Sequence, residues 1–167
     1  MSYNQGESVV HHQFGVGTVV GIETMNVNEE LRQFYRVSFD RTMLWVPVAG
    51  SSSGIRPITT KGNLAPFREV LKSSPAAFEG DFRQRQAEMT RRVDSGTFQG
   101  LCEIVRDLSA RLSGKPLNLY ESTLLKRSRD ALITEWSAAS GCSSDQALDE
   151  IDGYLRHSIE QPPKAQV

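Results

Sequence analysis

The stretch His11–Glu23, "HHQFGVGTVVGIE", decides how the first third of this 167-residue chain folds. Glycines at positions 15, 17 and 21 alternate with strand-forming residues. A loop that binds a dinucleotide needs the spacing GxGxxG between a strand and a helix, so that the helix N-terminus meets the phosphates. Here the spacing is GxGxxxG, and another strand-forming run follows. We therefore predict a hairpin whose glycines permit a tight turn and a bend in a sheet, and not a phosphate site.

Residues with catalytic or metal-binding potential are few and scattered. Neighbours along a strand point to opposite faces of a sheet, so His11 and His12 are not expected to line one site. Cys102 and Cys142 belong to no CxxC or Cys/His cluster, which predicts two reduced thiols and neither a disulfide nor a structural zinc. No recognisable catalytic motif accompanies these histidines and cysteines. The sequence predicts a protein that is not an enzyme and binds no cofactor, metal or small-molecule substrate.

Outward from this hairpin, the first sixty residues have the composition of β-structure. Valine, isoleucine and aromatic residues dominate, with polar or glycine breaks between the runs. We predict strands at residues 8–12, 17–25, 34–39, 43–48 and 54–58. Tyr35, Val37 and Phe39 share one face and alternate with Phe34, Arg36 and Ser38 on the other, which is typical of a half-buried strand. Pro47 cannot donate to a ladder and must lie at an edge, a bulge or a strand end. Short strands of this kind indicate a small bent sheet or partial barrel.

From residue 60 onward the pattern becomes helical. We predict helices at residues 63–73, 81–96, 97–114, 118–141 and 143–159. Asp81 is the expected N-cap of the second helix, and Ser143 with Gln146 forms a capping box for the last. In the third helix, apolar residues from Phe98 to Leu112 follow one face at helical spacing.

The predicted fold class is α+β: a β-module at residues 1–60, followed by an all-α bundle of four to five helices at residues 61–167. "GSSSG", residues 50–54, is expected to be a flexible loop, and residues 161–167 a frayed tail. No apolar run approaches the ~18 residues of a membrane span, and the N-terminus has no signal pattern. We expect a cytoplasmic protein without a membrane partner.

Charge is unevenly distributed although the net charge is only −1. Residues 82–93 carry four arginines against Glu88, whereas residues 143–160 carry five acidic residues against Arg156. On a helix the four arginines are spread around the axis and do not form one stripe. Phe82 stands beside them at the helix start. An aromatic side chain at this position either caps the core or stacks on an unpaired base. For the arginine-bearing helix as a whole, the simpler interpretation is a solvated amphipathic helix.

Five segments, in this order, resemble the CarD/CdnL family of bacterial RNA-polymerase-binding transcription factors. They are "YNQGESVVHHQFGVGTVVGIE", "YRVSF…LWVPV…GIRPI", "DFRQRQAEMTRRVDSGTFQGLCEIVRDLSARL", "LYESTLLKRSRDALITEW" and "SSDQALDEIDGYL". The resemblance implies a Tudor-like (SH3-like) N-terminal domain, also found in transcription-repair coupling factors, that docks on the β-subunit lobe of RNA polymerase by strand pairing. It also implies a helical domain that stabilises the open complex at the upstream edge of the promoter bubble. A tryptophan of this family wedges into the minor groove there, near the −10 element.

The resemblance places site residues on this chain with several departures from the family pattern. The wedge position falls on Phe82, which lacks the indole N–H. Among the basic positions after it, Arg85 is kept, whereas two others fall on Gln84 and Ala87. The expected DNA-contacting residues are Phe82, Arg83, Arg85, Arg91 and Arg92.

In the β-module, positions that are often arginine in the family fall on Met25 and Trp45. The expected polymerase-contacting residues are Thr24, Met25, Val27, Leu44, Trp45 and Val46. Alternation puts Trp45 on the face opposite Leu44 and Val46, and either a core position or an apolar anchor fits it. Trp136, late in a long helix, is expected in the core.

The sequence thus predicts a transcription regulator whose partners are the RNA polymerase β subunit and promoter DNA. The alternative is a protein-binding adaptor that keeps its polymerase or protein partner but whose helical domain does not contact DNA. The missing basic positions leave that alternative open.

Overall fold

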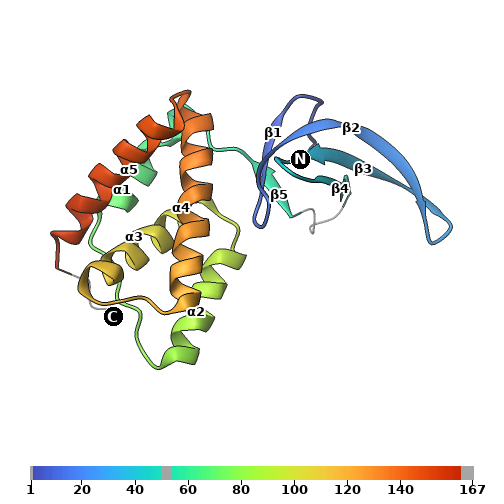
Figure 1. Cartoon of the computed structure of the whole chain (residues 1–167). Helices are drawn as coiled ribbons and strands as arrows, with labels where there is room; N and C mark the ends of the chain where they lie inside the picture. The colour runs from blue at the N-terminus through green and yellow to red at the C-terminus, as the bar shows by residue number, and fades with distance from the viewer. Residues whose placement is uncertain (1, 50–53, 163–167) are drawn as a thin grey trace. The chain divides into compact units, whose positions relative to one another are not determined.

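The computed structural model describes residues 2–49 and 54–162, and the chain divides into two compact units at Ile58/Thr59. The first unit is a sheet and the second is a set of helices, which confirms the α+β class (Figure 1). Most of the predicted loop and of the predicted tail, namely residues 50–53 and 163–167, lies outside the described residues. Of the remainder, Gln161 is tied to the helical unit, because its amide donates to the carbonyl of Lys72 at 3.0 Å.

Among residues 2–49 and 54–58, the sheet has five antiparallel strands in the order β4-β3-β2-β1-β5 and is not closed into a barrel (Figure 1). The strands are β1 (Ser8–His11), β2 (Gly15–Val27), β3 (Glu30–Ser38), β4 (Met43–Pro47) and β5 (Ile55–Pro57). Pro47 is the last residue of an edge strand, which satisfies the restriction set by its missing N–H. Tyr35, Val37 and Phe39 are buried in the module's core, as their alternation predicts.

The glycines act as predicted from the opening stretch. Gly15 has a φ of +75°, which a glycine adopts without strain, and it begins β2 directly after the turn. A bulge shifts the β2–β3 register between Val19 and Gly21, and such a bulge bends a strand. Gly17 lies so close to β3 that an added Cβ would stand 2.6 Å from the ring of Phe39 and 2.9 Å from the carbonyl oxygen of Ser38.

Gly17→Ala is therefore expected to destabilise the β-module by about 1–3 kcal/mol, the usual cost of forcing atoms into a packed site. Gly21→Ala is the matched control, because its Cβ would meet nothing closer than Arg36 Nη2 at 4.0 Å. Chemical denaturation followed by circular dichroism measures both variants. Equal stability of the two would contradict the close approach at Gly17.

The prediction that His11 and His12 cannot share a site is wrong. β1 ends at His11, so His12 already lies in the turn, where strand alternation no longer applies. The two rings stack with centroids 4.5 Å apart. Burial, with a smaller contribution from His12, lowers the pKa of His11. Nδ1 of His11 also accepts the backbone N–H of Gln13 at 3.1 Å, so the ring closes the turn.

β2 and β3 continue past their other neighbours as a two-stranded arm, residues 22–33. Their pairing runs as far as Val27 opposite Glu30, whereas the last backbone bonds from neighbouring segments, made by residues 6, 7 and 48, reach Val19 on β2 and Gln33 on β3. Asn28 and Glu29 close the arm with positive φ at both positions, the signature of a two-residue hairpin turn. Figure 1 shows the arm curving away from the rest of the sheet. In the part of the chain that the structure describes, both outer edges of the arm are therefore open except at Gln33, whose carbonyl accepts the N–H of Val48.

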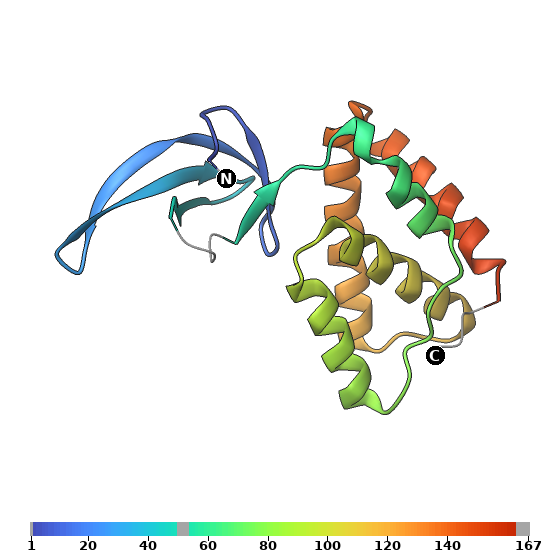
Figure 2. The ribbon, with the colours of Figure 1, turned by 180° about the vertical axis from the view of Figure 1, so that it is seen from behind.

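In residues 59–162 the second unit has five α-helices, whose buried side chains form one core (Figure 2). They are α1 (Ala65–Lys72), α2 (Phe82–Asp94), α3 (Phe98–Gly114), α4 (Leu119–Ser140) and α5 (Ser144–Ile159), with a short 3₁₀ helix η1 (Lys61–Asn63) before α1. The predicted caps are confirmed: Asp81 and Ser143 both form capping boxes, and Gly141 ends α4 in the left-handed region.

Trp136 is completely buried, as predicted, and its indole N–H donates to Glu150 at 3.2 Å. The apolar face of α3 is correct from Phe98 to Leu108, but the prediction for Leu112 is wrong, since that side chain is 52% exposed. The adjacent Arg111 lies 3.2 Å from the buried Glu121 at the start of α4. The last turn of α3 is thus fixed by an ion pair at the end of the core, and Leu112 points away from it.

Candidate functional site

The start of α2 displays Phe82. The Asp81 carboxylate accepts the N–H of Gln84 at 2.9 Å, and the Gln84 side chain accepts the N–H of Asp81 at 2.9 Å. This capping box fixes Phe82 as the first helical residue, and its side chain is 47% exposed. A large, half-exposed aromatic side chain therefore lies at a helix end that is fixed by its cap.

Two of the four predicted arginines point into the helical unit. Arg92 has a side chain only 10% exposed, and it donates to Glu88 at 2.7 Å and to Asp107 at 2.6 Å. Its guanidinium also covers the ring of Phe78. Arg85 donates to the carbonyl of Gly80 at 2.9 Å and lies 3.7 Å from Glu121. These two side chains hold α2 to its neighbours.

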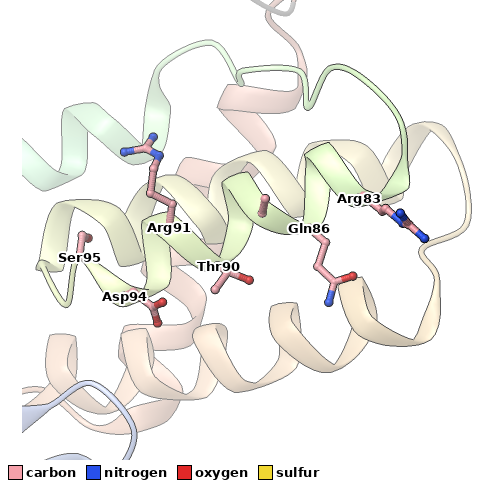
Figure 3. Close-up of a pocket in the computed structure, with 7 residues that line it drawn as sticks. Arg83, Gln86, Thr90, Arg91, Asp94 and Ser95 are labelled. Carbon is pink, nitrogen blue, oxygen red and sulfur yellow. The ribbon is translucent and has the colours of Figure 1, made fainter.

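The other two arginines lie on the exposed face of α2. Arg83 and Arg91 line an open depression together with Gln86, Ala87, Thr90, Asp94 and Ser95 (Figure 3). Eight residues of helix separate Arg83 from Arg91 by about 12 Å. Arg91 pairs with Glu88 at 2.9 Å, and hydrogen bonds from Arg91 and Arg92 lower the pKa of Glu88 to about 2. The structure thus separates the four arginines into two that point inward and two that are exposed, whereas the sequence showed only that they are spread around the helix.

Sequence reasoning missed the carboxylates that receive the inward arginines. Asp107 is 2% exposed and accepts from Arg92, from Arg106 at 2.7 Å and from the N–H of Ala76 at 2.9 Å. Glu121 is equally buried, beside Arg85 and Arg111. The signal for Asp107 was available in "EIVRDL", because a charged residue among the apolar residues of a helix needs a buried partner.

On the β-module, Trp45 lies outside the core, which excludes the core alternative. Its side chain is 46% exposed, on the face opposite the buried Val46. The indole N–H donates to Glu23 at 2.7 Å, and the other oxygen of Glu23 accepts from Arg36 at 2.7 Å. Glu23 is a further residue that sequence reasoning missed, because the contact spans two strands and depends on register.

The remaining polymerase candidates fall in two places. Thr24, Met25 and Val27 lie on the arm, where Met25 is opposite Arg32 and shares the outer face with Glu23. Val46 is buried and Leu44 packs against the same core. Their backbone groups face β3, because Val48 N–H donates to Gln33 and Phe39 N–H donates to Thr42, and bonded pairs alternate along an antiparallel ladder. The backbone groups on the outer edge of β4 therefore belong to Met43 and Trp45.

Within residues 2–49 and 54–162, His, Cys, Asp and Glu side chains form no group of three that could hold a metal ion. Both cysteines are free thiols. No helix of this part of the chain is long and apolar enough to cross a membrane.

Comparison with known proteins adds to this geometry. Residues 3–59 match the family model of the CarD-like/TRCF RID domain, and residues 67–152 match that of the CarD C-terminal domain. The chain belongs to the CarD family. The first match covers the sheet and the second runs from α1 into α5. The resemblance drawn from the sequence is therefore confirmed.

A curated relative, "Putative transcription factor YdeB" of Bacillus subtilis (strain 168), is 28% identical over 144 residues, which is 84% of this chain and 94% of the relative. The CarD family consists of transcription factors and interaction domains, and membership makes this chain a transcription-related, polymerase-interacting factor.

Proposed function

We propose that this protein regulates transcription by binding the β-subunit lobe of RNA polymerase through its sheet and promoter DNA through α2, and that it stabilises the open complex. The DNA contact lies near the −10 element, at the upstream edge of the bubble. The observation that carries the proposal is the half-exposed Phe82 at the fixed start of α2, beside Arg83 and Arg91, in a chain of the CarD family.

On this proposal the five DNA-site residues have three roles. Phe82 is the apolar wedge between bases, a role that phenylalanine has in other minor-groove proteins. Arg83 and Arg91 contact phosphates, which position a protein on DNA without reading its sequence. Arg85 and Arg92 act indirectly, because their side chains are only 20% and 10% exposed and face Glu121, Glu88 and Asp107. The Arg91 side chain also pairs with Glu88 but is 72% exposed. Arg85 and Arg92 hold α2 rigid while Phe82 inserts.

The sheet would bind the lobe by adding a strand. The arm and the outer edge of β4 present open backbone edges in the described part of the chain, and main-chain hydrogen bonds along such an edge supply affinity. Met25 and Trp45, on the outer face, supply side-chain anchors.

Trp45→Ala and Met25→Ala are each expected to remove the polymerase β subunit from material that co-purifies with the tagged protein. Leu31→Ala is the matched control: Leu31 is an exposed apolar residue of the same arm, opposite Asn26 and therefore on the other face from Met25. The β subunit is identified by immunoblot of a pull-down from cell extract. Recovery of β with Trp45→Ala at the level of the unmodified chain would refute the anchor role.

The adaptor alternative is favoured by one observation, the engagement of Arg85 and Arg92 inside the helical unit. Footprinting of promoter DNA with polymerase, with and without the protein, separates the two functions. The proposal requires added protection at the upstream edge of the bubble. Polymerase binding without that protection would establish the adaptor.

A further inference from the structure

The outer face of the sheet carries a three-strand cluster. Arg36 on β3 is paired with Trp45 on β4 and with Gly21 on β2, and Glu23 lies two residues along β2. All these side chains project away from the core that holds Tyr35 and Val37.

Glu23 holds this cluster together. One carboxylate oxygen accepts the indole N–H of Trp45 and the other accepts a guanidinium N–H of Arg36, both at 2.7 Å. β2 and β4 are separated by β3, so their backbones are about 10 Å apart. The indole therefore extends across β3 to reach Glu23. Gly21, which has no side chain, leaves the guanidinium of Arg36 unobstructed on that side.

The Arg36–Glu23 ion pair adds little to the stability of the fold. The side chains of Arg36 and Glu23 are 41% and 37% exposed, and ion pairs at such positions contribute little to folding. Holding a tryptophan in one orientation affects binding to a partner more than it affects folding. An immobilised side chain costs about 0.5–1.5 kcal/mol in lost rotamer freedom when a complex forms, and a side chain that is fixed beforehand avoids most of that cost.

We infer that Glu23 is a positioning residue that fixes the indole of Trp45 in its polymerase-binding orientation. This inference rests on the proposed function. Because Arg36 takes up the charge of Glu23, the indole ring and its neighbours Phe34, Met43 and Pro47 make this spot mainly apolar. The group of the lobe that contacts Trp45 is accordingly an apolar side chain.

A double-mutant cycle on binding to a purified β-lobe fragment tests the inference. Glu23→Thr removes the carboxylate and keeps a strand-forming residue, whereas Trp45→Phe keeps an aromatic ring without the N–H donor. Each single variant is expected to bind about tenfold more weakly, equivalent to 1.4 kcal/mol. The double variant should bind no more weakly than Trp45→Phe alone, because Glu23 then has no indole N–H to hold.

Two further variants sharpen the readout. Glu23→Gln retains an acceptor for the indole N–H and is expected to restore most of the affinity. Asp40→Asn, in the turn after β3, removes the same charge at a fully exposed position and should bind like the unmodified chain. Raising the salt concentration should change the affinity by less than twofold, since the contact is apolar.

The outcomes separate the two levels of the proposal. Additive losses in the cycle, or unchanged binding by Glu23→Thr, overturn the positioning role while the polymerase contact stands. A steep fall of affinity with salt overturns the apolar contact. No binding of the unmodified chain to the lobe overturns the proposed function, and the inference with it.

Discussion

Replacing Phe82 with alanine is expected to shorten the lifetime of the promoter open complex by about 5- to 150-fold and to leave polymerase binding unchanged. Stacking of an aromatic side chain on a base contributes about 1–3 kcal/mol, and this variant would lose that contribution. Phe82 is half exposed and its helix is capped by Asp81, so folding should be barely affected. The lifetime is measured as the decay of competitor-resistant complexes.

Leu119→Ala supplies the matched control for Phe82. Leu119 is also the first residue of a helix with a capping box, and its side chain is 84% exposed. Truncating it removes a comparable apolar side chain from a comparable position. Equal lifetimes with Phe82→Ala and with the unmodified protein would show that Phe82 is not the wedge of this protein.

The second large effect is expected at Asp107. Asp107→Ala should reduce the free energy of unfolding of the helical unit by about 3–5 kcal/mol, because buried cations are costly when they lose their partner. Arg92 and Arg106 both donate to this carboxylate, and each side chain is only 10% exposed. Urea denaturation followed by circular dichroism measures the change.

Asp94→Ala is the control for Asp107→Ala, since Asp94 is exposed at the end of α2. If Asp107→Ala lowers the free energy of unfolding by less than about 1 kcal/mol, Arg92 and Arg106 find other partners. The same variant also bears on function: Asp107 anchors α2 through Arg92, so its loss should shorten the open-complex lifetime even though Asp107 itself is buried.

Much of the fold could be predicted from the sequence because its determinants are local. Alternation in Tyr35, Val37 and Phe39 identifies a half-buried strand, and the side chains of Asp81 and Ser143 mark helix starts within one turn. The GxGxxxG spacing excluded a phosphate loop without reference to any distant residue.

The parts that could not be predicted depend on contacts between distant segments. A helical wheel shows that four arginines surround α2, but Asp107 and Glu121, on α3 and α4, determine which of them turn inward. Strand alternation places Trp45 on the outer face, yet only the register across β3 brings Glu23 to its indole. Leu112 fits the apolar pattern of α3 and is exposed because the core ends before it.

The open edges of the β2–β3 arm have a consequence for the free protein. A ribbon with unsatisfied backbone groups on both sides can pair with a second copy of itself and begin aggregation. Charged side chains on such an edge oppose that association, and Glu29, Glu30 and Arg32 occupy the turn and the strand after it. We expect these charges to disfavour pairing of the arm with a second copy of itself.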